Sequence, residues 1–190
     1  MQEQLQAHVK RLLGDPNALT LFRILAVPVV VLLLMIPNRF TCFLAALFFS
    51  LAAITDYFDG MLARQKGMVT NLGKVMDPVA DKLLVSCTFI MLAALNWAPA
   101  WIVCIIIGRE IAVTGLRNLI AQEREDLSAS NLGKFKTAFQ ITAAIPLLLH
   151  YSFLGLNMHA IGMFFLWLAL IFTLWSGIDY FVRYRRLLQP

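Results

Sequence analysis

Long apolar runs alternate with short polar segments along this chain. Each run is close to the roughly 20 residues that an α-helix needs to cross about 30 Å of hydrocarbon. The six runs cover residues 19–36, 40–63, 73–95, 100–120, 132–151 and 156–180. The pattern predicts an all-α fold, a polytopic membrane protein with six transmembrane helices. We expect a single membrane domain over residues 1–190, with the six-helix bundle at residues 18–188.

The N-terminal segment has a different pattern. Leu5, Val9, Leu12 and Leu13 fall on one face of a helix, and polar residues fill the rest of it. This pattern predicts a short amphipathic helix at residues 1–14, lying on the membrane surface. A frayed polar tail is the alternative.

Composition and charge agree with a membrane location. Hydrophobic residues make up 60% of the chain and charged residues 14%, whereas about a quarter of the residues in a soluble domain are charged. If both ends lie on one side of six spans, all 16 Lys and Arg residues except Arg39 fall near that side. Basic residues collect on the cytoplasmic side of membrane proteins. The formal charge of +5 therefore indicates a membrane surface rather than nucleic acid as the partner.

Four carboxylates, Asp56, Asp59, Asp77 and Asp81, lie near the cytoplasmic ends of the second and third runs. An ionisable group inside a bilayer costs at least a few kcal/mol, so it needs a partner or a function. In helices, the i, i+3 and i, i+4 spacings place each pair on one face. Mg²⁺ prefers such carboxylates together with substrate phosphates. Two ions could clamp the attacking and leaving oxygens of a displacement at phosphorus.

The residues around these carboxylates suit a phosphate-bearing substrate. Gly60, Ala63 and Gly73 have little or no side chain, so a flat group or a neighbouring backbone can approach closely. Arg64 supplies a planar fork of donors for phosphate. The simpler interpretation, in which the aspartates only pair with nearby lysines, leaves the glycines unexplained.

The pattern DxxDGxxARx8GxxxDxxxD, which runs from Asp56 to Asp81, resembles the signature of the CDP-alcohol phosphatidyltransferases. Six predicted spans agree with that family's fold. The resemblance implies that a hydroxyl of a small polar alcohol attacks the phosphorus next to the diacylglycerol in CDP-diacylglycerol, and that CMP leaves. It also implies Mg²⁺ or Mn²⁺ as cofactor, a homodimer, and an active site that faces the cytoplasm.

The resemblance also implies roles for single residues. Asp56, Asp59 and Asp77 are expected to bind the metal, and Asp81 to complete the metal site or to act as the base; Asp77 and Asp81 are the candidate catalytic residues. A carboxylate that holds a metal has a lowered proton affinity, so the base role of Asp81 is favoured only weakly. The expected CDP-lipid site comprises Asn17, Thr20, Asp56, Asp59, Gly60, Ala63, Arg64 and Gly73.

Four cations at the cytoplasmic ends of the fourth and fifth runs, Arg109, Arg117, Lys134 and Lys136, are candidates for binding the acceptor. Basic groups inside a membrane enzyme suggest an anionic acceptor such as a phosphorylated alcohol. Ordinary basic anchors at the membrane surface are the alternative.

Three shorter strings resemble the bacterial phosphatidylglycerophosphate synthases within the family: NALTLFR from Asn17, GREI from Gly108 and GKFKTAFQ from Gly133. This implies glycerol 3-phosphate as the acceptor and the bacterial inner membrane as the location. Inositol phosphate, serine and phosphatidylglycerol are alternative acceptors. An intramembrane prenyltransferase and a cation transporter with buried carboxylates are further alternatives.

We expect no catalytic role for the cysteines or the histidines. Cys42, Cys87 and Cys104 lie in apolar runs, where cysteine behaves as a small hydrophobe. His150 and His159 fall on the predicted side opposite the aspartates, so an interfacial or structural role is expected for them.

Overall fold

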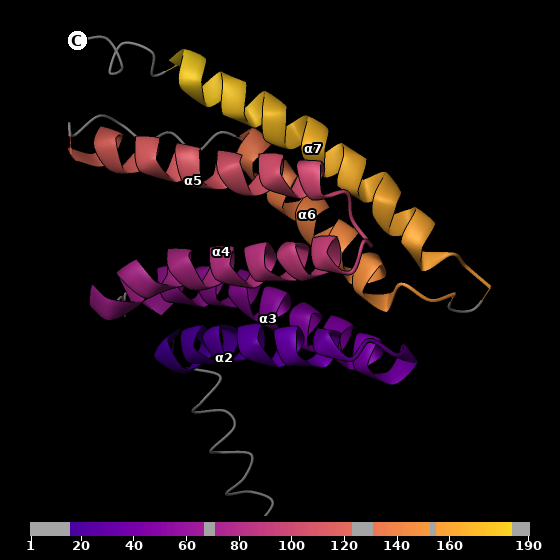
Figure 1. Ribbon diagram of the computed structural model, residues 1–190. Coiled ribbons are helices and arrows are strands. Elements are labelled where there is room, and N and C mark those ends of the chain that lie inside the picture. The colour runs from indigo at the N-terminus through magenta and orange to yellow at the C-terminus, as the bar shows by residue number, and fades with distance from the viewer. Residues whose placement is uncertain (1–15, 67–70, 123–130, 153–154, 184–190) are drawn as a thin grey trace, which may run out of the picture. The chain divides into compact units, whose positions relative to one another are not determined.

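The computed structural model contains six helices in the part of the chain that it describes, residues 16–66, 71–122, 131–152 and 155–183 (Figure 1). They are α2 (Pro16–Met35), α3 (Arg39–Lys66), α4 (Asn71–Ala94), α5 (Ala100–Gln122), α6 (Asn131–Leu149) and α7 (Met158–Arg183). Each helix coincides with one predicted apolar run to within a few residues. The all-α prediction is therefore confirmed. The predicted surface helix at residues 1–14 lies outside the described residues.

Membrane-spanning capacity is clearest in α7. Within the described residues it is the one helix that is long and apolar enough, by length and composition, to cross a membrane. Shorter apolar stretches of four other helices cover Leu21–Met35, Arg39–Thr55, Lys82–Ala94 and Phe135–Leu149. The number of six transmembrane helices therefore stays a prediction.

The chain divides into two compact units, residues 1–88 and residues 89–190. In the first unit, α2 packs against α3 (Figure 1). Val30 and Leu34 of α2 are buried, as are Ala45 and Phe49 of α3. Residues spaced four apart lie on one face of a helix, so each helix has an apolar face that is buried.

The turn between α2 and α3 is held by reciprocal hydrogen bonds between Asn38 and Thr41. The side-chain oxygen of Asn38 accepts from the backbone N–H groups of Phe40 and Thr41, at 2.9 and 3.0 Å. Thr41 Oγ1 accepts from the backbone N–H of Asn38 at 2.9 Å. These contacts satisfy N–H groups that have no partner inside the helix, so they fix where α3 begins.

In the second unit, α7 packs along α6 and also contacts α5 (Figure 1). The backbone of α6 comes very close to α7 at Gly162. A Cβ atom at Gly162 would lie 2.6 Å from Cγ of Leu147 and 2.9 Å from its backbone nitrogen. Because those distances leave no space for a side chain, glycine at this position sets how closely the two helices pack.

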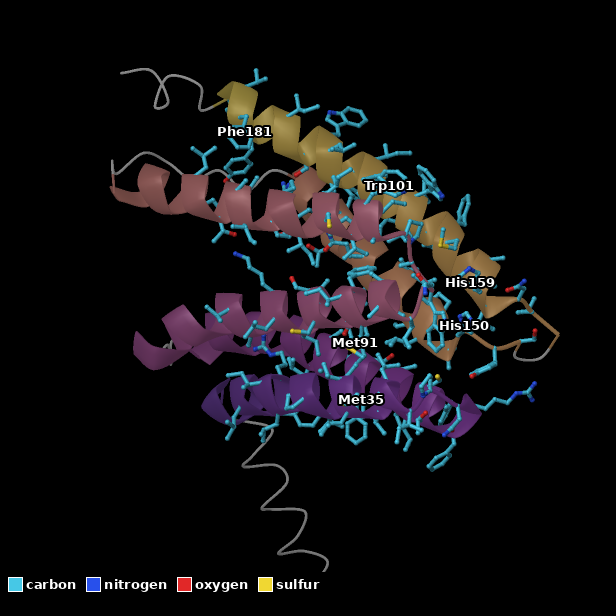
Figure 2. All side chains as sticks on the ribbon, in the orientation of Figure 1. Met35, Met91, Trp101, His150, His159 and Phe181 are labelled. Atoms are coloured by element: carbon cyan, nitrogen blue, oxygen red, sulfur yellow. The ribbon has the colours of Figure 1, made fainter. Side chains whose placement is uncertain are left out.

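An aromatic group lies where α6 ends and α7 begins. The rings of Trp97 and His150 stack with centroids 3.9 Å apart. The His159 ring centroid lies 5.1 Å from that of His150, and Figure 2 labels both histidines. His150 lies just beyond the end of α6, with a positive φ of 51°. These contacts support the structural role expected for the two histidines.

Candidate functional site

The predicted metal and nucleotide motif lies on two consecutive helices. Asp56 and Asp59 belong to α3, and Asp77 and Asp81 belong to α4. The helical backbone at these positions confirms the assumption behind the spacing argument, which places each pair of carboxylates on one helix face. The side chains of residues 56–78 and 81, which include all four aspartates, Gly60, Ala63, Arg64 and Gly73, lie outside the described part of the structure, as do those of Asn17 and Thr20.

The chemistry of this donor set fits a divalent cation. Carboxylate oxygens at i, i+3 and i, i+4 spacing are the hard ligands that Mg²⁺ and Mn²⁺ prefer. Among the side chains that the structure does describe, no group of three or more His, Cys, Asp or Glu residues could hold a metal. Metal binding by the aspartates stays a prediction, because their side chains lie outside the described part of the structure.

The second candidate site comprises Arg109 and Glu110 of α5, Lys136 of α6 and Ser176 of α7, which we call the cation cluster. The carboxylate oxygen Oε1 of Glu110 accepts a hydrogen bond from Lys136 and one from Nη1 of Arg109, the latter at 3.4 Å. Nη2 of Arg109 donates to Oγ of Ser176 at 2.5 Å. Three helices thus meet through polar side chains.

Burial makes the pairing within the cation cluster important. The side chains of Arg109, Lys136 and Glu110 are only 9%, 10% and 16% exposed. A buried charge without a partner costs several kcal/mol, and the shared carboxylate of Glu110 offsets part of that cost for both cations. The cluster still carries an excess of positive charge.

Arg109 also has donor capacity that the described residues do not use. Its Nε atom is buried and has no hydrogen-bond partner among them. Buried N–H groups in proteins are nearly always paired, and those of a guanidinium bind anions strongly. The cluster can therefore accept an anion that brings its own oxygen acceptors.

Two residues of α7 shape the surroundings of Arg109, and the sequence did not single them out. Ser176 is the acceptor described above, and a Cβ atom on the next residue, Gly177, would lie 3.2 Å from Cγ of Arg109. The missing side chain thus leaves room for the Arg109 stem. The only signal in the sequence is two adjacent small residues, Ser176 and Gly177, inside a mostly apolar run.

Arg117 lies two helical turns beyond Arg109 on α5 and also contacts α7. Its Nε donates to the hydroxyl of Tyr180 at 3.0 Å, and its Cζ lies 5.2 Å from the centre of the Tyr180 ring. The contact combines a hydrogen bond with a cation–π interaction. Of the four predicted acceptor cations, the structure brings Arg109 and Lys136 together, places Arg117 on the same helix as Arg109, and leaves the Lys134 side chain outside the described part.

Comparison with known proteins shows the family. A family model described as CDP-alcohol phosphatidyltransferase matches residues 14–175. The chain belongs to the CDP-alcohol phosphatidyltransferase family, and the resemblance of the Asp56–Asp81 motif is confirmed. Membership disfavours the prenyltransferase and cation-transporter alternatives.

Within this family, the chain is similar to proteins that share one name. The chain is 42% identical over 178 residues to the CDP-diacylglycerol–glycerol-3-phosphate 3-phosphatidyltransferase of Bacillus subtilis, with 87% of this chain and 92% of the relative covered. The protein of the same name from Rickettsia prowazekii is 41% identical, with 87% of this chain and 92% of the relative covered. The one from Escherichia coli K12 is 37% identical, with 87% of this chain and 91% of the relative covered.

Proposed function

We propose that this protein transfers the phosphatidyl group of CDP-diacylglycerol to glycerol 3-phosphate, giving phosphatidylglycerophosphate and CMP in phospholipid biosynthesis. Family membership and the names of the relatives support this reaction. The structural observation that supports a phosphorylated acceptor is the pairing of Arg109 with Lys136 through Glu110.

The cation cluster and Arg117 bind the acceptor phosphate in this proposal. A phosphate monoester carries nearly two negative charges at pH 7, and it offers several oxygens to the unused Nε of Arg109 and to the ammonium of Lys136. Because Arg109 and Lys136 are largely buried, their interaction with an anion is screened less than it would be in water. Lys134 is proposed as a further contact with the phosphate.

The aspartates and the residues near them act on the lipid substrate. Asp56, Asp59, Asp77 and Asp81 would hold Mg²⁺ or Mn²⁺, which neutralises charge on the diphosphate when bound. Arg64 binds phosphate oxygens, and Gly60, Ala63 and Gly73 leave space for the nucleotide. Asn17 and Thr20 contribute to the same CDP-lipid site.

The proposed reaction forms one bond to phosphorus, breaks another and transfers one proton. The acceptor hydroxyl oxygen forms a bond to the phosphorus that carries the diacylglycerol, and the bond from that phosphorus to the oxygen of CMP breaks. The hydroxyl proton goes to a carboxylate, and Asp81 is the proposed base. CMP leaves with the electron pair of the broken bond.

The location and assembly proposed here follow the sequence pattern and the family. The proposed location is the bacterial inner membrane, with six transmembrane helices and the active site at the cytoplasmic face, and the distribution of basic residues along the sequence supports this orientation. A homodimer is proposed as the assembly. Single-cysteine variants and a membrane-impermeant thiol label test this topology. A cysteine at Arg39 should react with label added outside the cell, and cysteines at residues 67–70 should react only with label added on the cytoplasmic side.

The proposed reaction is tested with purified protein in detergent, CDP-diacylglycerol and Mg²⁺ or Mn²⁺. CMP release is compared among glycerol 3-phosphate, inositol phosphate, serine and phosphatidylglycerol. Glycerol 3-phosphate should give the highest kcat/KM. Release of CMP with another acceptor but not with glycerol 3-phosphate would refute the choice of acceptor and leave the family assignment standing.

A further inference from the structure

Arg109 comes to the cation cluster from α5, but the hydroxyl that holds one end of its guanidinium comes from α7. The two residues are 67 positions apart in sequence, and Nη2 of Arg109 lies 2.5 Å from Oγ of Ser176. Ser176 is 1% exposed. A buried hydroxyl that accepts a hydrogen bond from a guanidinium restricts the rotation of that group about its last side-chain bonds.

The stem of Arg109 is restricted at the same point of α7. Gly177 has no side chain, and a Cβ atom there would lie 3.2 Å from Cγ and 3.6 Å from Nε of Arg109. A methyl group would therefore push the stem away by a few tenths of an ångström. The positions of the guanidinium and of the stem are thus both set by two consecutive residues of α7.

The orientation that results matters for anion binding. Nη2 is used by Ser176 and Nη1 by Glu110, whereas Nε is buried and has no partner among the described residues. A guanidinium that turned freely would present any of its edges to a ligand, and its five donors have a fixed geometry. Because Ser176 and Glu110 bond the two terminal nitrogens of Arg109, the N–H of Nε remains for the anion.

We propose that Ser176 and Gly177 are positioning residues for the acceptor site: they orient the guanidinium of Arg109 so that its free edge meets the acceptor phosphate. The proposal rests on the proposed function, because it assigns the phosphate of the acceptor as the ligand of Arg109. Neither residue touches the reacting atoms. Both act through Arg109.

A double-mutant cycle on purified protein tests this role. Ser176→Ala removes the hydroxyl and should raise the KM for glycerol 3-phosphate about tenfold, since hydrogen bonds to charged groups are worth that much. The KM for CDP-diacylglycerol should change less than twofold. In the Arg109→Lys background, which lacks Nη2, Ser176→Ala should change the KM for glycerol 3-phosphate less than twofold. Ser50→Ala is the matched control, because the Ser50 hydroxyl bonds only the carbonyl of Ala46 on its own helix at 2.7 Å.

Gly177→Ala tests whether the space left by Gly177 positions the side chain of Arg109. It should raise the KM for glycerol 3-phosphate severalfold without changing the KM for the lipid, whereas Gly115→Ala on α5, where a Cβ atom meets nothing within 4 Å, should leave both unchanged. Equal KM values for glycerol 3-phosphate in Gly177→Ala and Gly115→Ala would overturn the positioning role of Gly177.

The outcomes separate this proposal from the proposed function. If Arg109→Lys raises the KM for glycerol 3-phosphate and Ser176→Ala does not, the positioning role is wrong and the acceptor site stands. If Arg109→Lys leaves that KM unchanged, the acceptor site itself is wrong. If Ser176→Ala has the same tenfold effect with and without Arg109, the serine does not act through the arginine, and the positioning role is again wrong.

Discussion

Lys136 of α6 donates a hydrogen bond to the carboxylate of Glu110 on α5, and this contact links two helices through an ion pair that is largely buried. The same carboxylate oxygen accepts from Arg109. Glu110 is therefore the counter-charge for both cations of the cluster.

Glu110→Gln should lower the free energy of unfolding by about 3 kcal/mol, because it removes the carboxylate that the buried Arg109 and Lys136 share. Thermal denaturation in detergent measures this change. Glycerol 3-phosphate should raise the Tm of the variant more than the Tm of the unchanged protein, since the phosphate replaces the missing negative charge. Equal stabilisation of both proteins by the ligand would contradict this account.

Asp56→Asn, Asp59→Asn and Asp77→Asn should each abolish CMP release while the protein stays folded, because an amide keeps the size of the side chain but loses its charge. Chelation of the divalent cation should have the same effect, and added Mg²⁺ or Mn²⁺ should reverse it. Asp179→Asn is the matched control: its carboxylate pairs with Arg183 on the same helix at 3.1 Å. The two side chains are 28% and 47% exposed, and an ion pair that reaches solvent contributes little, so this variant should stay active.

Arg109→Ala should raise the KM for glycerol 3-phosphate about 10- to 100-fold, the range expected when a charged group loses its hydrogen bonds to a phosphate. The KM for CDP-diacylglycerol should change much less. Steady-state kinetics with each substrate varied in turn makes the comparison. Arg183→Ala, which removes an arginine that is 47% exposed, is the control, and a similar effect in both variants would point to general electrostatics instead.

Gly162→Ala should destabilise the packing of α6 on α7 by about 1–3 kcal/mol, the usual cost of overpacking. The added methyl group would lie 2.9 Å from the backbone nitrogen of Leu147, which cannot move without shifting its helix. The Tm in detergent reports the loss. Gly115→Ala adds the same methyl group where nothing lies within 4 Å, so its Tm should be unchanged or slightly higher, in line with the better helix propensity of alanine.

The helices could be predicted from sequence because long apolar runs leave few alternatives to a buried helix. The turn at Asn38 has a local cause, because Asn38 and Thr41, three residues apart, satisfy the first N–H groups of α3. The aspartate motif was also local: its spacing depends on helix periodicity, and α3 and α4 provide that periodicity.

The partners of the cations were not readable from sequence. Ser176 looked like any serine in an apolar helix, where the hydroxyl commonly bonds a carbonyl of its own helix, as Ser50 does. The neighbouring Ser176 and Gly177 gave no indication of which residue of another helix lies against them.

By itself, the sequence determined the helical class, the order of the helices, the carboxylate motif and the family. Only the tertiary structure decided that Arg109 and Lys136 share Glu110, and that Ser176 and Gly177 hold Arg109. The physical reason is that periodicity places residues on a face of one helix, whereas contacts between helices depend on how α5, α6 and α7 pack against one another.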